Sequence, residues 1–176
     1  DIENTTKEEG KKYTPKQHHF DEAFGYFGVP ADWDKNSNGD FWGKYCNSRN
    51  EKLNTNSIFD DFLKARAAID NDVHEDQIQP VKDIITKIEK VAAGTAINYF
   101  NKSKGQTGGD RLHSLTEGLC FLRACKFGNS DAKVTPADVA DVEVLLNGGN
   151  FWEITNTQID AAVAKLAEVS GLPSDL

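Results

Sequence analysis

Two stretches of the chain place histidine and glutamate at the spacing of contacting residues on a helix. His18 and His19 precede Glu22 by four and three residues, and His113 precedes Glu117 by four. These spacings bring the side chains onto one helix face. A carboxylate from one helix, combined with imidazole and carboxylate from another, can hold iron, manganese or zinc. The sequence therefore predicts a transition-metal site, for iron or zinc, formed by these five residues.

A plain structural interpretation of these pairs stays open. Many helices carry a His–Glu pair that is only hydrogen bonded. The chain has no H-E-x-x-H helix, no G-x-S-x-G elbow and no phosphate-binding P-loop. Its three cysteines are too few for a disulfide framework, and we predict that Cys120 and Cys125 are small buried residues.

A second candidate site lies in residues 34–40, which read D-K-N-S-N-G-D. Alternating oxygen-bearing side chains followed by glycine match the first half of a calcium-binding loop. The predicted calcium ligands are Asp34, Asn36, Asn38 and Asp40. Tyr45 stands where the complete loop has a bidentate glutamate, so the alternative is a turn that caps the next helix.

The elements that must position these residues are helices. Residues 1–13 are polar and lack periodicity, which predicts a flexible arm. The rest, 14–176, is predicted to form one all-α domain, a helical bundle of about six or seven helices, because no segment alternates with period two. The helix start signals are Thr14-Pro15, Ser57, Thr135-Pro136 and Thr155, and the stop signals are Gly28, Gly128, Gly148-Gly149 and Gly171.

The helix that holds His113 has leucines on one side. His113 and Glu117 lie on the opposite side, in line with Cys120 and Ala124 and beside Phe121, so that side is largely apolar as well. A helix that is apolar on both sides lies centrally in its bundle. A His–Glu pair buried there needs polar partners, because unpaired burial costs several kcal/mol. We therefore expect the helix beginning near Pro15 to pack beside it and to bring both His–Glu pairs into one pocket.

Composition excludes several classes of protein. The 176 residues carry 20 Lys and Arg against 28 Asp and Glu, a net charge of −8, and no basic patch for nucleic acid is visible. The apolar fraction of 38% indicates a folded globular protein. No apolar run is long enough to span a membrane. Met is absent, so we expect an N-terminus made by processing or truncation.

Several segments together carry a family resemblance: HHFDEAFGYFGVP, FWGKYCN, IFDDFLKARAAI, INYFN and HSLTEGLCFL. Over most of residues 13–172 the chain resembles the C-terminal part of a domain-of-unknown-function family, the one numbered four-eight-five-six. That family occurs in cell-surface lipoproteins of Bacteroidota and has imelysin-like relatives. The resemblance implies an imelysin-like helical bundle and a location in the cell envelope or outside the cell, as an outer-membrane lipoprotein or periplasmic protein. It also implies a longer protein, whose upstream helical region, or another envelope protein, would be the partner.

Imelysin-like proteins have a G-x-H-x-x-E motif proposed to bind metal, and the group includes a proposed insulin-cleaving peptidase and iron-regulated proteins. His19 and Glu22 have the H-x-x-E spacing, with Gln17 at the glycine position, whereas His113 and Glu117 are one residue too far apart. We therefore expect a non-enzymatic envelope binding protein for a metal or an iron-containing ligand. The alternatives are an imelysin-like metallopeptidase and an accessory subunit of a surface assembly that holds no metal.

Overall fold

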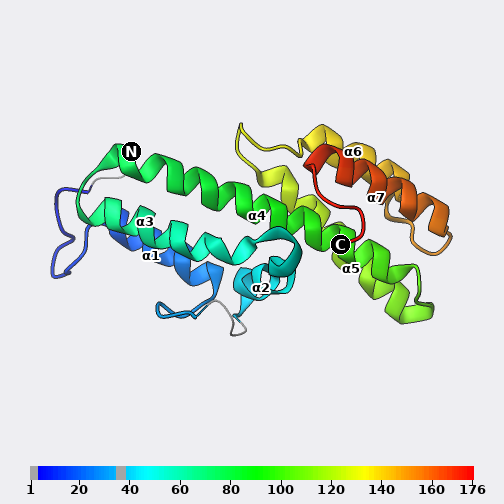
Figure 1. Cartoon of the computed structure of the whole chain (residues 1–176), viewed down its shortest axis with the longest axis horizontal. Coiled ribbons are helices and arrows are strands. Elements are labelled where there is room, and N and C mark those ends of the chain that lie inside the picture. The colour runs from blue at the N-terminus through cyan, green and yellow to red at the C-terminus, as the bar shows by residue number, and fades with distance from the viewer. Residues whose placement is uncertain (1–3, 35–38) are drawn as a thin grey trace. The chain divides into compact units, whose positions relative to one another are not determined.

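The computed structural model describes residues 4–34 and 39–176, and Figure 1 shows that they are helical. No strand occurs in these ranges, which confirms the predicted all-α class. Three short 3-10 turns (Thr55–Ser57, Cys125–Phe127 and Asn147–Gly149) join helices. The α-helices are α1 (Pro15–Phe27), α2 (Phe41–Leu53), α3 (Ile58–Asp70), α4 (His74–Ser103), α5 (Gly108–Ala124), α6 (Pro136–Leu145) and α7 (Asn156–Ser170).

The chain divides into two compact units, Asp1–Ile88 and Glu89–Leu176. The first unit holds α1, α2, α3 and the first half of α4, and the second holds the rest of α4 with α5, α6 and α7. The sequence indicated one bundle domain over 14–176 and carries no linker at this boundary, because the 30-residue α4 continues through it.

Threonine caps start three helices where the sequence predicted them. Thr14 accepts a hydrogen bond from the backbone N–H of Gln17 at 3.2 Å and its own N–H donates to Gln17 Oε1 at 2.9 Å, a complete capping box. Thr135 and Thr155 cap α6 and α7 in the same way. Ser57 precedes α3 as predicted, but its side chain makes no capping hydrogen bond, because its hydroxyl donates to the carbonyl of Asn54.

The core of the first unit is aromatic. Phe20, Phe24 and Phe27 of α1 face Phe59 and Phe62 of α3, with ring centroids 5.2 to 6.1 Å apart. Such tilted and edge-on contacts stabilise beyond the area that they bury. The aromatic face of α1 therefore packs on α3.

Polar contacts fasten the same unit. Asp61 of α3 is buried and forms an ion pair with Lys87 of α4. Arg66 of α3 bridges Asp21 of α1 and Asp70. These bonds fix α3 between its two neighbours.

The N-terminal segment, as far as it is described, contacts the helices of the first unit. Asn4 Nδ2 donates to the carbonyl of Ile69 and to Asp72 Oδ1, both at 2.9 Å. Its Oδ1 accepts from the Thr14 hydroxyl at 2.7 Å. Asn4 thus links the end of α3 to the start of α1.

The second unit packs aliphatic side chains from all its helices. Phe100 of α4 is fully buried against Gly118 of α5, where an added Cβ would lie 2.5 Å from the ring. Arg111 of α5 donates to the carbonyls of Ser103 and Ile154 at 3.0 and 3.1 Å and so joins three helix ends. The aliphatic core includes Val91, Ile97, Leu115, Leu122, Val139, Val142, Ile159 and Leu166.

Candidate functional site: a groove between α1 and α4

The predicted metal residues of α1 contact one another on the surface. His18 Nε2 lies 3.5 Å from Glu22 Oε1, and His19 Nδ1 lies 3.1 Å from Glu22 Oε2. Their side chains are 40%, 58% and 52% exposed, in the order His18, His19, Glu22. Tyr13 stacks on the His18 ring with centroids 4.8 Å apart. His18, His19 and Glu22 therefore form a cluster, as the helical spacing predicted, but the cluster is exposed to solvent.

The predicted metal residues of α5 do not lie in a buried face. His113 and Cys120 are exposed, and Glu117 is half-buried. The expectation that this side of α5 is buried is wrong for His113, and the predicted burial of Cys120 is wrong as well. The leucine side of α5 supplies its core contacts, with Leu115, Leu119 and Leu122 buried.

The two His–Glu pairs belong to different units, α1 to the first and α5 to the second. Within the described ranges, no three His, Cys, Asp or Glu side chains form a group that could hold a metal ion. Burial raises the pKa of the Cys46 and Cys125 thiols to about 12, so both thiols are protonated at neutral pH. The iron or zinc site stays a prediction.

The predicted calcium loop falls largely outside the described residues, because Asn36 and Asn38 are in the undescribed range 35–38. Asp34 and Asp40 are described and exposed. Asp40 occupies the N-cap position of α2, without a capping hydrogen bond from its side chain. The calcium site therefore also stays a prediction.

The first unit has a groove between α1 and residues 74–88 of α4. It has two adjoining halves of about 570 and 520 Å³. We call it the α1–α4 groove. Phe20, Ala23, Gln77 and Val81 line both halves. The first half is also lined by Lys16, His19, Ile69, His74, Ile78 and Lys82, and the second by Tyr26, Phe27, Trp42, Phe62, Ile84, Ile85 and Ile88.

The order of these residues shows how the helices run. Moving from the first half to the second, the lining residues advance along both α1 and α4, and retreat from Ile69 to Phe62 along α3. Thus α1 and the first half of α4, which form the two walls of the groove, run parallel to each other. Helix α3 runs antiparallel to both. The aromatic core described above forms part of the floor.

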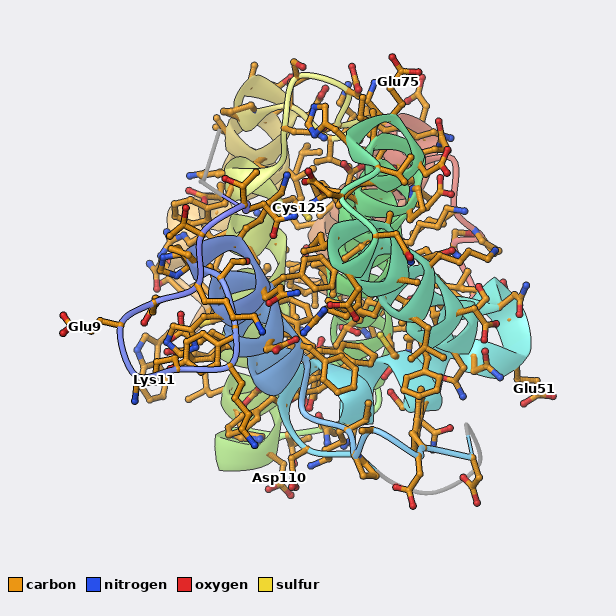
Figure 2. All side chains as sticks on the ribbon, turned by 90° about the vertical axis from the view of Figure 1, so that its left-hand side faces the viewer. Glu9, Lys11, Glu51, Glu75, Asp110 and Cys125 are labelled. Atoms are coloured by element: carbon orange, nitrogen blue, oxygen red, sulfur yellow. The ribbon has the colours of Figure 1, made fainter. Side chains whose placement is uncertain are left out.

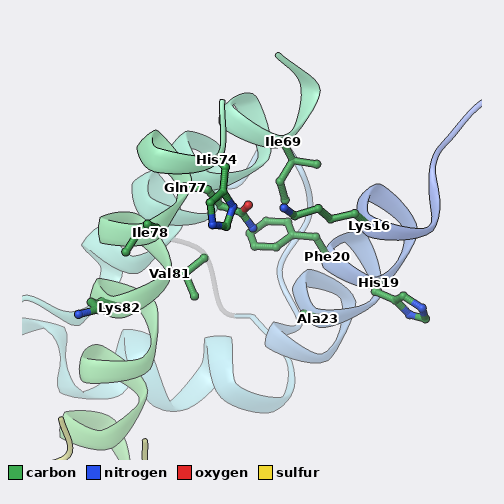
Figure 3. Close-up of a pocket in the computed structure, with 10 residues that line it drawn as sticks. All are labelled: Lys16, His19, Phe20, Ala23, Ile69, His74, Gln77, Ile78, Val81 and Lys82. Atoms are coloured by element: carbon green, nitrogen blue, oxygen red, sulfur yellow. The ribbon is translucent and has the colours of Figure 1, made fainter. Parts of the chain in front are cut away.

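The groove leaves large apolar side chains open to solvent. Tyr26 is 77% exposed and Ile78 is 45% exposed. In the close-up of Figure 3, Lys16 and His74 point toward each other across Phe20, whereas His19 and Lys82 point away from the groove. An apolar groove with a few convergent polar groups is the usual form of a small-molecule binding site.

Sequence reasoning missed this groove. Ile78, Val81, Ile85 and Ile88 recur at helical spacing, a pattern that is typical of a helix buried against its neighbours in a bundle. The stripe exists, but in this unit part of it faces an open groove. The one available signal was that His74, Gln77 and Lys82 interrupt the stripe with polar groups.

The fold and this groove define an all-α helical protein with an open apolar groove. The sequence profile of the family described as "Domain of unknown function (DUF4856)" matches residues 1–172, so the chain belongs to that family. The chain matches no curated protein and no solved structure. None of its described helices has the length and apolarity needed to cross a bilayer.

Proposed function

We propose that this protein is a non-enzymatic binding protein that acts in the cell envelope or outside the cell, and that the α1–α4 groove is its binding site. The observation that carries the proposal is the open apolar groove. Its two halves each have the volume of a small-molecule site. Contiguous exposed apolar surface of this kind is typical of a site that binds a ligand or another macromolecule.

We expect the uncharged fluorescent probe N-phenyl-1-naphthylamine to bind saturably, with a blue-shifted emission, in the groove. Ala23 lines both halves and is exposed, so the substitution Ala23→Trp fills the groove without disturbing the core. The variant should weaken probe binding roughly tenfold or more, because the indole occupies the space of the ligand. Fluorescence titration measures the effect.

Ala161→Trp is the matched control, because Ala161 is exposed on α7 in the other unit. It should bind the probe as the parent protein does. Equal loss of binding in both variants, or no saturable binding by the parent, would contradict the groove as the site.

Metal binding remains a second candidate function, since His18 and His19 both contact Glu22. If these residues take part in an iron or zinc site, protein purified without chelator should contain stoichiometric metal by elemental analysis. The substitution Glu22→Gln should then lower that content. Cleavage of peptides that depends on added zinc would favour the imelysin-like metallopeptidase, and absence of both metal and probe binding would favour an accessory subunit of an envelope assembly.

The calcium prediction has its own measurement. If Asp34 and Asp40 contribute to a calcium site, millimolar calcium should raise the melting temperature, because a ligand that binds only the folded state stabilises it. Asp34→Asn should reduce the shift, and magnesium at the same concentration serves as the comparison. A melting temperature that does not change with calcium would favour the alternative, in which residues 34–40 form a turn that caps the next helix.

A further inference from the structure

The two halves of the α1–α4 groove differ in charge. The first half is lined by two lysines and two histidines, and no carboxylate is among its lining residues. The second half has no charged lining residue at all. The whole chain carries a net charge of −8, so the basic character of this end is opposite in sign to the net charge of the protein. The groove is therefore itself amphipathic along its length.

The two basic groups that point into the first half are Lys16 and His74 (Figure 3). Neither has an ion-pair partner among the described residues. Gln77 lies beside them and can donate through its amide. A cation, an imidazole and an amide that converge over an apolar floor form a receptor for an anionic head group.

Nearby carboxylates are directed elsewhere. Asp70 accepts from Arg66 and Gln17, Asp72 accepts from Asn4, and Glu22 contacts both histidines of α1.

Glu75 and Asp76 occupy the first turn of α4 but do not line the groove. Figure 2 shows Glu75 pointing outward. The positive charge of Lys16 is thus not neutralised by a neighbour. Moreover, α1 and α4 both begin at this end, and the positive ends of their dipoles add to the potential there.

We propose that the α1–α4 groove binds an elongated amphipathic anion, taken up as a free monomer, of the class of long-chain aliphatic carboxylates. The acid group lies between Lys16 and His74, and the aliphatic chain lies along Val81, Ile84 and Ile88. The wall from His74 to Ile88 is about 21 Å long at 1.5 Å per helical residue, enough for an extended chain. This inference rests on the proposed function and names its ligand class.

The test is displacement of N-phenyl-1-naphthylamine by three compounds with the same alkyl chain: dodecanoate, dodecan-1-ol and dodecyltrimethylammonium. All are used as monomers below their micelle concentrations. Dodecanoate should displace the probe at a roughly tenfold lower concentration than the alcohol, since a charge-assisted contact forms only with the acid. The cationic compound should be the weakest.

The substitution Lys16→Met keeps the aliphatic stem and removes the charge. It should abolish the preference for dodecanoate while leaving displacement by dodecan-1-ol unchanged. Lys64→Met is the matched control, because Lys64 is exposed on α3 and does not line the groove. It should keep the preference for the acid.

Each other outcome has a definite meaning. If the probe does not bind, the proposed function fails, and the inference fails with it. If the probe binds but the acid and the alcohol displace it equally, only the inference is overturned. Cosedimentation with phosphatidylglycerol vesicles that depends on Lys16, without displacement by dodecanoate, would assign the groove to a membrane surface instead. Loss of probe binding as the protein dimerises would assign it to a second copy of the chain.

Discussion

The substitution Gly118→Ala should destabilise the second unit by about 2 kcal/mol, although alanine is normally the better helix former. Gly118 lies within α5, and a methyl group there would lie 2.5 Å from Cε1 and 2.7 Å from Cδ1 of Phe100. The Phe100 ring is fully buried, so it cannot turn away without opening the core. Denaturant unfolding followed by circular dichroism measures the change in the free energy of unfolding.

Gly25→Ala is the matched control. Gly25 also lies within a helix, α1, but an added Cβ would meet nothing within 4 Å. This variant should gain about 0.5 kcal/mol, because alanine restricts the unfolded chain. In addition, Phe100→Leu should cost less in the Gly118→Ala protein than in the parent, since the two residues are in contact. Equal effects of both glycine substitutions would contradict the packing of α5 on α4.

The substitution Asp61→Ala should cost about 3 kcal/mol of stability, because it leaves the Lys87 ammonium without its partner in a largely buried place. The side chain of Asp61 is 7% exposed and that of Lys87 is 21% exposed. The pair joins α3 to α4 within the first unit, so its loss should also loosen the groove wall. Thermal and denaturant unfolding measure the loss.

Two comparisons isolate the cause. Asp160→Ala removes the partner of Lys104 from a surface pair in which Asp160 is 59% exposed, and it should cost less than about 1 kcal/mol. The double substitution Asp61→Leu with Lys87→Met should recover most of the stability, because no buried charge is then left alone. If Asp61→Ala were as mild as Asp160→Ala, the buried pair would not be what holds α3 to α4.

Local signals in the sequence predicted much of this fold. Thr14, Thr135 and Thr155 start helices because a threonine side chain satisfies a free backbone N–H at that position, and this chemistry is local. Gly28 and Gly171 end helices in the left-handed conformation, with φ of 88° and 68°. Ser57 also precedes a helix, α3, but its side chain does not cap it, because Ser57 is part of a 3-10 turn that the sequence pattern does not distinguish.

The α1–α4 groove was harder to predict, because it depends on which helix faces pack against each other in the fold. Helical spacing correctly placed His18 and His19 beside Glu22, but it could not say whether His113 is covered, and His113 is exposed. Val81 belongs to an apolar stripe of α4, and the sequence pattern of such a stripe is the same whether the stripe packs against another helix or lines an open groove. Only the positions of α1 and α3 relative to α4 reveal the cavity and its basic end.

The most direct test of the central claim, that the α1–α4 groove binds an amphipathic anion, is a methyl NMR titration of the 19.4 kDa protein with monomeric dodecanoate. The methyl signals of Ala23, Val81 and Ile85 should shift and saturate together, because these residues line the groove. Those of Ile159 and Leu166, buried in the second unit, should stay in place. Saturable shifts confined to the second unit, or none at all, would contradict the account.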